Sequence, residues 1–414
     1  MALEMPAPSR VGAARRQWRA LLDAPMAPYY FVLASVGGLV GLGLLMVLSA
    51  SAPLAQEWGH SPYYFALRQV LFLMIGLVGA WFLARLGPDG IMRLGWPAWI
   101  LATVLLLLVM SSLGHHSGGN QNWLDLGPIR LQPSEFAKLA LVVFAATVLH
   151  RKRRRLHRPA ELAVPLVPAS AVLFILIIAG RDLGTGIIMA AIFSLLLWFV
   201  GTPMKLLLPA GAAAAVLVGL LVQGSDNRMG RISIFLDPSS NTDLASQPMS
   251  GLYALASGGW WGAGLGASRQ KWGGLKTAAH TDYIFAVLGE ELGLFGVLAV
   301  IAMFALLAYA GFAIAMRSDT LFGRLAAAGI TGWFLCQGII NMFVVLHLLP
   351  VLGVPLPFVS YGGSALMANL FAVGVLLACA RATPDARRYL RTRKRNNGGR
   401  RRMTSVMAAS KGDR

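Results

Sequence analysis

The 414-residue sequence has little charge and almost no cysteine. Asp, Glu, Lys and Arg together make up 13% of the residues, whereas about a quarter is usual in soluble domains. The two cysteines, Cys336 and Cys379, each lie in an apolar run, which argues against a disulfide scaffold. The sequence also lacks a nucleophile motif, a phosphate-binding glycine loop and a cysteine-based metal site. These absences exclude an ordinary set of soluble domains and a disulfide-rich secreted protein.

Long apolar runs take the place of a charged surface. Hydrophobic residues make up 57% of the chain, and its mean hydropathy is positive. Because about 20 apolar residues span a bilayer as a helix, the sequence predicts an all-α polytopic membrane protein with about ten transmembrane helices. The predicted spans cover residues 29–51, 69–87, 95–112, 134–149, 163–179, 184–201, 206–223, 283–316, 325–346 and 360–380.

The basic residues predict the orientation. With a cytoplasmic N-terminus, 27 of the 36 Lys and Arg residues fall on the cytoplasmic side, as the positive-inside rule requires. We therefore expect a basic cytoplasmic segment over 1–28, a ten-span membrane domain over 29–381, and a basic, disordered cytoplasmic tail over 382–414. The tail's basic run Arg391–Arg402 has no interleaved aromatic residues. This is typical of a segment near anionic lipid or of a docking site for a cytoplasmic partner, and no nucleic acid is expected as a partner.

One extracytoplasmic loop, between spans seven and eight, is much longer than the others. It covers about 224–282 and carries Arg231, Arg269, Lys271 and Asp282. Long ordered loops on compact chains are usually functional. Asp282 lies where this loop meets the bilayer surface, so it is a candidate general base, although capping of the following helix explains an acid there equally well.

Three further polar clusters lie near the outer ends of predicted spans. Glu135 and Lys138 are spaced i, i+3 on one helix face, which favours either a self-neutralised pair or a functional pair at membrane depth. Asp182 is a candidate helix-start carboxylate or part of a polar cavity floor. Ser360 follows two prolines and is a candidate helix cap, as is Ser134 ahead of Glu135. The adjacent His115 and His116 are more typical of a polar loop than of a metal site.

In their order along the chain, these motifs resemble those of the SEDS family (shape, elongation, division and sporulation). The members of this family are ten-span membrane glycosyltransferases that polymerise peptidoglycan from lipid II. The resemblance runs from about Leu44 to Leu377. Its motifs are Gly43–Ser51, Gln132–Lys138, Asp182–Thr185, Phe235–Pro238, Ala256–Gly262, His280–Phe285, Gly289–Gly293 and Leu349–Ser364.

The resemblance implies a role for each candidate residue. Asp282 matches the family's catalytic acid, and positions lining the family's central cavity match Glu135, Lys138, Asp182 and Ser360. An inverting displacement needs a base for the attacking 4-hydroxyl and positive charge for the undecaprenyl diphosphate leaving group. The candidates for holding diphosphates are Lys138, Arg231, Arg269 and Lys271. No metal ligands are predicted, although a divalent cation, Mg or Mn, could share that role.

The resemblance also implies a setting for this activity. Gly43–Ser51 and Ser61–Gln69 are more similar to the division members of the family than to the elongation members, which remain an alternative. The implied partners are lipid II and undecaprenyl-linked glycan, a class B penicillin-binding protein (a transpeptidase) and other division proteins. The implied location is the septum, in the bacterial inner membrane. A lipid II flippase and a non-catalytic division scaffold are the competing functions.

This sequence departs from the family pattern at three places. Arg181 stands where proline usually precedes Asp182, and Gln121 stands where a basic residue is usual. Thr277 and Ala278 replace a Pro-Glu pair ahead of the His280–Phe285 motif. The first two departures affect the charge balance of the cavity, and the third affects the loop conformation near Asp282.

Overall fold

The computed structural model of the protein describes residues 22–117, 120–125, 127, 130–155, 159–239 and 242–393. Residues 1–21 of the predicted N-terminal segment and residues 394–414 of the predicted C-terminal tail therefore lie outside the described residues. Within the predicted C-terminal tail, residues 384–393 are helical, whereas the sequence predicted that the tail is disordered. Arg317 donates hydrogen bonds to the carbonyls of Leu22 and Ala24, which fixes the described N-terminus against the bundle.

Each of the ten predicted spans is a helix. Seven helices are long and apolar enough to cross a bilayer by length and composition, and three shorter apolar helices cover Gly95–Val109, Val164–Ala179 and Leu183–Phe199. The chain is therefore a multi-pass helical membrane protein, as expected where lipid offers backbone groups no hydrogen bonds. The helices are α2 (Ala27–Glu57), α3 (Tyr64–Arg93), α4 (Gly95–Val109), α5 (Pro133–Arg151), α6 (Pro159–Ala179), α7 (Leu183–Phe199), α8 (Met204–Gln223), α11 (Ile284–Arg317), α12 (Leu321–Val345) and α13 (Gly363–Arg381).

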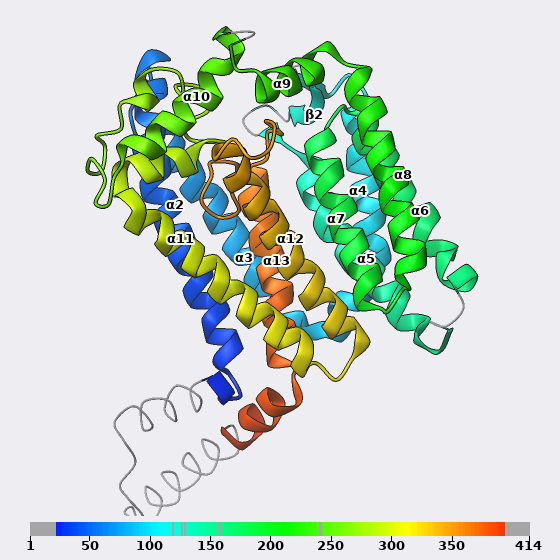
Figure 1. The fold of residues 1–414 in the computed structure, drawn as a ribbon. Coiled ribbons are helices and arrows are strands. Elements are labelled where there is room, and N and C mark those ends of the chain that lie inside the picture. Colours follow the sequence, from blue (N-terminus) through cyan, green and yellow to red (C-terminus); the bar gives the residue numbers. More distant parts are fainter. Residues whose placement is uncertain are drawn as a thin grey trace, which may run out of the picture.

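The centre of the bundle is formed by α5, α12 and α13 (Figure 1). In its most apolar stretch α13 is 94% buried and α5 is 83% buried, whereas α8 is not buried at all. Small residues allow the closest contacts. A Cβ atom added to Gly374 of α13 would lie 2.5 Å from the Ala80 carbonyl oxygen of α3, so the two backbones touch.

One end of the bundle is covered by the chain between α8 and α11 and by a small antiparallel sheet (Figure 1). The sheet has the order β1 (Gly114–Ser117), β2 (Asn120–Asp125) and β3 (Arg130–Leu131). The predicted long loop over 224–282 contains α9 (Asp226–Leu236), α10 (Thr242–Ser257) and the 3₁₀ turn η2 (Gln270–Trp272). A second 3₁₀ turn, η1 (Arg153–Arg155), follows α5 at the opposite end. The loop is therefore largely helical, which gives its side chains fixed positions.

The chain over 224–282, which we call the cover, is attached to α11 by the close approach of Gly262 and Gly293. Gly293 has φ 64° and ψ −163° and divides α11 at a kink. A Cβ atom on Gly293 would lie 2.4 Å from the backbone nitrogen of Gly262, so a larger residue does not fit. The backbone amides of Ala263 and Gly264 donate to the carbonyls of Glu290 and Glu291 at the same place. Backbone contacts therefore attach the cover directly to α11 at this point.

The described ends of the chain lie at the end of the bundle opposite α9 and α10 (Figure 1). With Cys336 and Cys379 replaced by serine, we expect a membrane-impermeant thiol reagent added outside whole cells to label Thr277→Cys. Arg154→Cys and Arg393→Cys should react only after the cells are permeabilised, because the basic flanks are expected inside. The reverse labelling pattern would place α9 and α10 in the cytoplasm.

Candidate functional site

Asp282 is half-buried and lies two residues before α11, at the covered end of the bundle. Asn341 of α12 fixes its backbone. The Asn341 Nδ2 group donates to the Asp282 carbonyl at 2.8 Å and to the Val354 carbonyl at 2.8 Å. Asn341 itself is 1% exposed. One buried amide thus holds together the start of α11 and the segment between α12 and α13.

Ser360 makes a second connection between these two segments. Its hydroxyl donates to the Thr281 carbonyl at 2.6 Å and accepts from the Leu356 amide at 2.9 Å. The next amide, that of Tyr361, donates to the His280 carbonyl at 2.8 Å. The prediction that Ser360 caps the last span is wrong, since Gly362 is the N-cap of α13. Ser360 instead fixes the backbone on which Asp282 stands.

Glu135 and Lys138 form the predicted pair, with 2.8 Å between Lys138 Nζ and Glu135 Oε1. Glu135 is 1% exposed and Lys138 is not exposed. Lys138 also donates to Gln337 Oε1 at 2.8 Å, and the Gln337 Nε2 group donates to the Pro355 carbonyl at 2.9 Å. The Trp333 indole donates to the same Gln337 oxygen at 2.8 Å. The ion pair therefore supports, through Gln337, the segment that Asn341 and Ser360 join to Asp282.

Asp182 lies at the predicted helix start, as the N-cap of α7, and its Oδ1 accepts from the Thr185 amide at 3.1 Å. Its other oxygen accepts from Ser134 at 3.1 Å, Gln132 at 3.2 Å and Asn122 at 3.3 Å. Ser134 does not cap α5, as the sequence suggested, because Gln132 is the N-cap and the Ser134 hydroxyl bonds to Asp182. Asp182 thus joins the sheet, α5 and α7.

Arg231 of α9 reaches the same place as Asp282. A Cβ atom added to Gly353 would lie 3.8 Å from Asp282 Oδ2 and 3.9 Å from Arg231 Nη1. Gly353 has φ 69°, a conformation that favours glycine, so the acid and the guanidinium group both lie beside the bare backbone of this glycine. Arg231 Nη1 is held by the Val351 carbonyl at 3.3 Å.

Burial changes the acid–base properties of this site. It raises the pKa of Asp282 to about 6, although the charge of Arg231 opposes the shift. Burial also lowers the pKa of His280 to about 4, so this histidine is neutral at pH 7. At neutral pH the site therefore has an ionised carboxylate that is more basic than an ordinary aspartate.

Arg228, one helical turn before Arg231, adds positive charge that sequence reasoning missed. Its Nη2 group donates to the Arg181 carbonyl at 3.0 Å. The pKa of Arg228 is lowered, mainly by burial and then by the charges of Arg181 and Arg231, while Asp182 opposes this. Three arginines therefore lie close together, with Asp182 near Arg228 and Asp282 near Arg231. The i, i+3 spacing of two of them on α9 was the available signal.

The structure does not bring Arg269 and Lys271 to Asp282. Lys271 is buried and uses its ammonium protons on Glu291 at 2.8 Å, Ser49 at 2.9 Å and the Gly266 carbonyl at 2.8 Å. Arg269 is exposed, and its backbone amide donates to Glu290 at 2.9 Å. Their partners Glu290 and Glu291 lie on α11, about two helical turns beyond Asp282. They hold the cover against α11.

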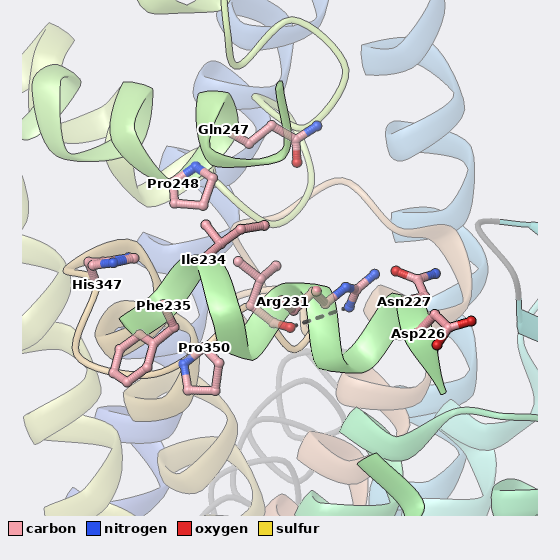
Figure 2. A pocket seen from close by; sticks show the side chains of 11 residues that line it. Asp226, Asn227, Arg231, Ile234, Phe235, Gln247, Pro248, His347 and Pro350 are labelled. Atoms are coloured by element: carbon pink, nitrogen blue, oxygen red, sulfur yellow. Dashed lines mark hydrogen bonds between the residues drawn. The ribbon is translucent and has the colours of Figure 1, made fainter. Parts of the chain in front are cut away.

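A cavity of about 190 Å³ lies between α9, α10 and the segment after α12 (Figure 2). Arg231 forms part of its wall, so the cavity begins next to the acid. Within the described residues, no group of three or more His, Cys, Asp or Glu side chains gathers to hold a metal ion. The wall is formed by Asp226, Asn227, Gly230, Arg231, Ile234, Phe235, Gln247, Pro248, His347, Pro350 and Val351.

Comparison with known sequences gives matches over most of the chain. The FtsW/RodA/SpoVE family model, described as "Cell cycle protein", matches residues 30–384. The chain is 36% identical over 387 residues to the "Probable peptidoglycan glycosyltransferase FtsW" of Mycobacterium tuberculosis, covering 92% of this chain and 74% of that protein. It is 36% identical over 361 residues to the "Stage V sporulation protein E" of Bacillus subtilis, covering 83% and 94%.

Two solved structures share the fold. One belongs to a study titled "Structural coordination of polymerization and crosslinking by a peptidoglycan synthase complex". It has a TM-score of 0.70 and 28% identity, covering 85% of this chain and 97% of that chain. The other is the rod shape determining protein RodA of Thermus thermophilus, with a TM-score of 0.64 and 27% identity, covering 85% and 96%.

The buried ion pair makes a prediction about stability. Glu135→Gln or Lys138→Met alone leaves one charge unpaired inside the bundle, so each should cost about 3–5 kcal/mol. The double variant should cost much less than the sum, measured by thermal unfolding in detergent. The matched control is the exposed pair of Lys276 and Glu57, 2.9 Å apart, where single changes should cost about 0–1 kcal/mol. Additive losses at Glu135 and Lys138 would contradict the coupling.

Proposed function

The chain belongs to the FtsW/RodA/SpoVE family of cell cycle proteins, and from this we propose that it is a peptidoglycan glycosyltransferase that polymerises glycan strands from lipid II. The observation that carries the proposal is the half-buried Asp282 beside Arg231 at the covered end of the bundle. An ionised acid with a raised pKa and adjacent positive charge are the two requirements of an inverting transfer from a diphosphate.

Asp282 acts as the general base in this proposal. Its carboxylate takes the proton of the attacking sugar 4-hydroxyl as the oxygen forms a bond to the anomeric carbon of the other substrate. The bond from that carbon to the diphosphate oxygen breaks, and undecaprenyl diphosphate leaves with the electron pair. Inversion converts the α-linked diphosphate into a β-1,4 link in one step. The raised pKa favours the proton transfer, because a stronger base removes the proton more readily.

Arg231, with Arg228 and Arg181 nearby, would stabilise the negative charge that develops on the leaving diphosphate. A diphosphate needs positive charge rather than a proton, so a second acid is unnecessary. Arg269 and Lys271, which the sequence also suggested for this role, have their contacts at Glu290 and Glu291 instead. We therefore assign diphosphate binding to the arginines of α9 and to Arg181.

Glu135, Lys138 and Gln337 would act by positioning. Among the described residues they form no hydrogen bond or ion pair with Asp282, but they hold the Pro355 carbonyl of the segment that Asn341 and Ser360 join to Asp282. Asp182, with its four hydrogen bonds, would fix the sheet and α7 beside the arginines.

The biological setting is also proposed from similarity. Relatives named FtsW match 92% of the chain, which favours synthesis of septal wall during cell division over an elongation role like that of RodA. One structural neighbour belongs to a peptidoglycan synthase complex that coordinates polymerization and crosslinking, so we propose a class B transpeptidase, a crosslinking enzyme, as a partner of this chain. Both termini would be cytoplasmic, which places Asp282 on the outer face, where lipid II is consumed.

Asp282→Asn keeps the size of the side chain and removes its basicity. A positioned base contributes about 10²–10⁴-fold to the rate of a reaction. The rate at which the purified protein polymerises labelled lipid II should therefore fall about 10²–10⁴-fold or more. Expression and lipid II binding should be unchanged, because binding uses diphosphate and lipid contacts. A flippase would still move the lipid after this substitution, and the wild-type protein would form no polymer. Near-normal polymerisation by the variant would end the assignment of the base.

The rate of polymerisation should depend on pH through Asp282. A general base works only when deprotonated, so the rate should rise with pH up to about 6 and then level. His280 does not contribute to this rise of the rate near pH 6, because its pKa is about 4. In Arg231→Gln the midpoint should move upward, since the arginine lowers the pKa of Asp282. A pH profile that is identical in wild type and Arg231→Gln would mean another group controls the rate.

A further inference from the structure

The cavity bounded by α9, α10 and the segment after α12 has no role in the mechanism proposed above (Figure 2). It shares Arg231 with the catalytic centre, and Arg231 Nη1 lies beside the same glycine as Asp282 Oδ2. A molecule bound in the cavity would therefore contact an arginine that also lies beside the catalytic acid. This continuity suggests a binding site for a part of the substrate that does not react.

The wall of the cavity has the chemistry of a sugar site. Rings of Phe235, Pro248 and Pro350 offer flat apolar surfaces, and the side-chain amides of Asn227 and Gln247 are polar groups of the wall. The Gln247 Nε2 group donates to the Thr277 hydroxyl at 3.3 Å, which positions this amide at the cavity. Sugar rings have apolar C–H faces and polar edges, and pockets that orient such ligands combine apolar walls with a few placed polar groups.

The charge of the wall points to a neutral ligand. Its formal charges are one acid, Asp226, and one base, Arg231, which cancel. A phosphate would require an excess of positive charge, and a basic peptide would require an excess of acid. The cavity volume of about 190 Å³ is far above the roughly 10–15 Å³ that holds a single water molecule, so the cavity has room for a small organic ligand such as one sugar ring.

His347 gives an independent indication of a ligand. Its ring lies 5.3 Å from that of Phe235, and its Nε2 atom is buried without a hydrogen-bond partner among the described residues. Its backbone adopts φ 55°, which is unfavourable for a residue with a side chain. Unpaired buried polar atoms and strained residues are both uncommon and tend to gather at binding sites.

We propose that this cavity binds one neutral sugar unit of the peptidoglycan strand, next to the unit that reacts at Asp282. The inference rests on the proposed glycosyltransferase function and adds a subsite to it. The subsite keeps the strand in register with the catalytic acid, while Arg231 faces both the cavity and the reacting groups.

The test uses the full-length protein in detergent and a peptide-free tetrasaccharide of alternating N-acetylglucosamine and N-acetylmuramic acid, in which the lactyl carboxyl groups are converted to amides so that every unit is neutral. Ile234→Trp fills the cavity and Gln247→Leu removes an amide, so each should weaken tetrasaccharide binding about tenfold or more. Polymerisation should slow at low lipid II concentration and recover at high concentration, which is an effect on KM. Asp282→Asn should show the opposite pattern, with intact binding and a lost rate.

Met229→Trp is the matched control, because Met229 is an exposed residue of α9 outside the cavity wall. It should bind the tetrasaccharide and polymerise lipid II like wild type. If Ile234→Trp does not fold, Gln247→Leu carries the test. Polymerisation by a wild-type protein that does not bind the tetrasaccharide would overturn the subsite and leave the glycosyltransferase intact.

Two other results separate the possibilities. Cavity variants that bind sugar normally but lose a co-purified transpeptidase would overturn the sugar site and identify a protein-docking pocket. The wild-type protein could instead bind the tetrasaccharide and form no polymer, while both cavity variants lose the binding. That result would support the sugar site and refute the glycosyltransferase function.

Discussion

A lysine ammonium group without access to water must find its partners inside the protein, and Lys138 imposes this requirement on the centre of the bundle. It bonds to Glu135 and Gln337, and Gln337 in turn holds the Pro355 carbonyl. The segment fixed in this way is joined by Asn341 and Ser360 to the backbone at Asp282. The position of a functional carboxylate at the covered end of the bundle therefore depends on a charge that lies within α5.

The spans could be predicted from the sequence because lipid requires long apolar helices, and all ten runs are helices. Local capping rules were less successful at polar positions. Ser134 lies in the first turn of α5 and Ser360 precedes α13, yet each hydroxyl bonds to a group distant in sequence, Asp182 and the Thr281 carbonyl respectively. Such partners become available only when the helices pack, so a pattern of neighbouring residues could not reveal them.

The candidate site was predicted unevenly for the same reason. Asp282 could be named because it lies in a recognisable motif, and Glu135 and Lys138 because they are one helical turn apart. Gln337 and Asn341 lie in an apolar run, where a lone amide gives little indication of its partners, and Arg228 was overlooked beside Arg231. Lys271 was suggested from its charge and place in the outer loop, but its charge is used by Glu291.

The burial of Asp282 also has a consequence for folding stability. Because its pKa is raised to about 6 in the folded protein, the folded chain binds this proton more tightly than the unfolded chain, where the pKa is about 3.9. For this group, stability falls as the pH rises from about 4 to about 6 and stays reduced at neutral pH. The ionised acid therefore opposes folding at the pH where it is useful, and the hydrogen bonds of Asn341 and Ser360 to the backbone around it offset that loss of stability.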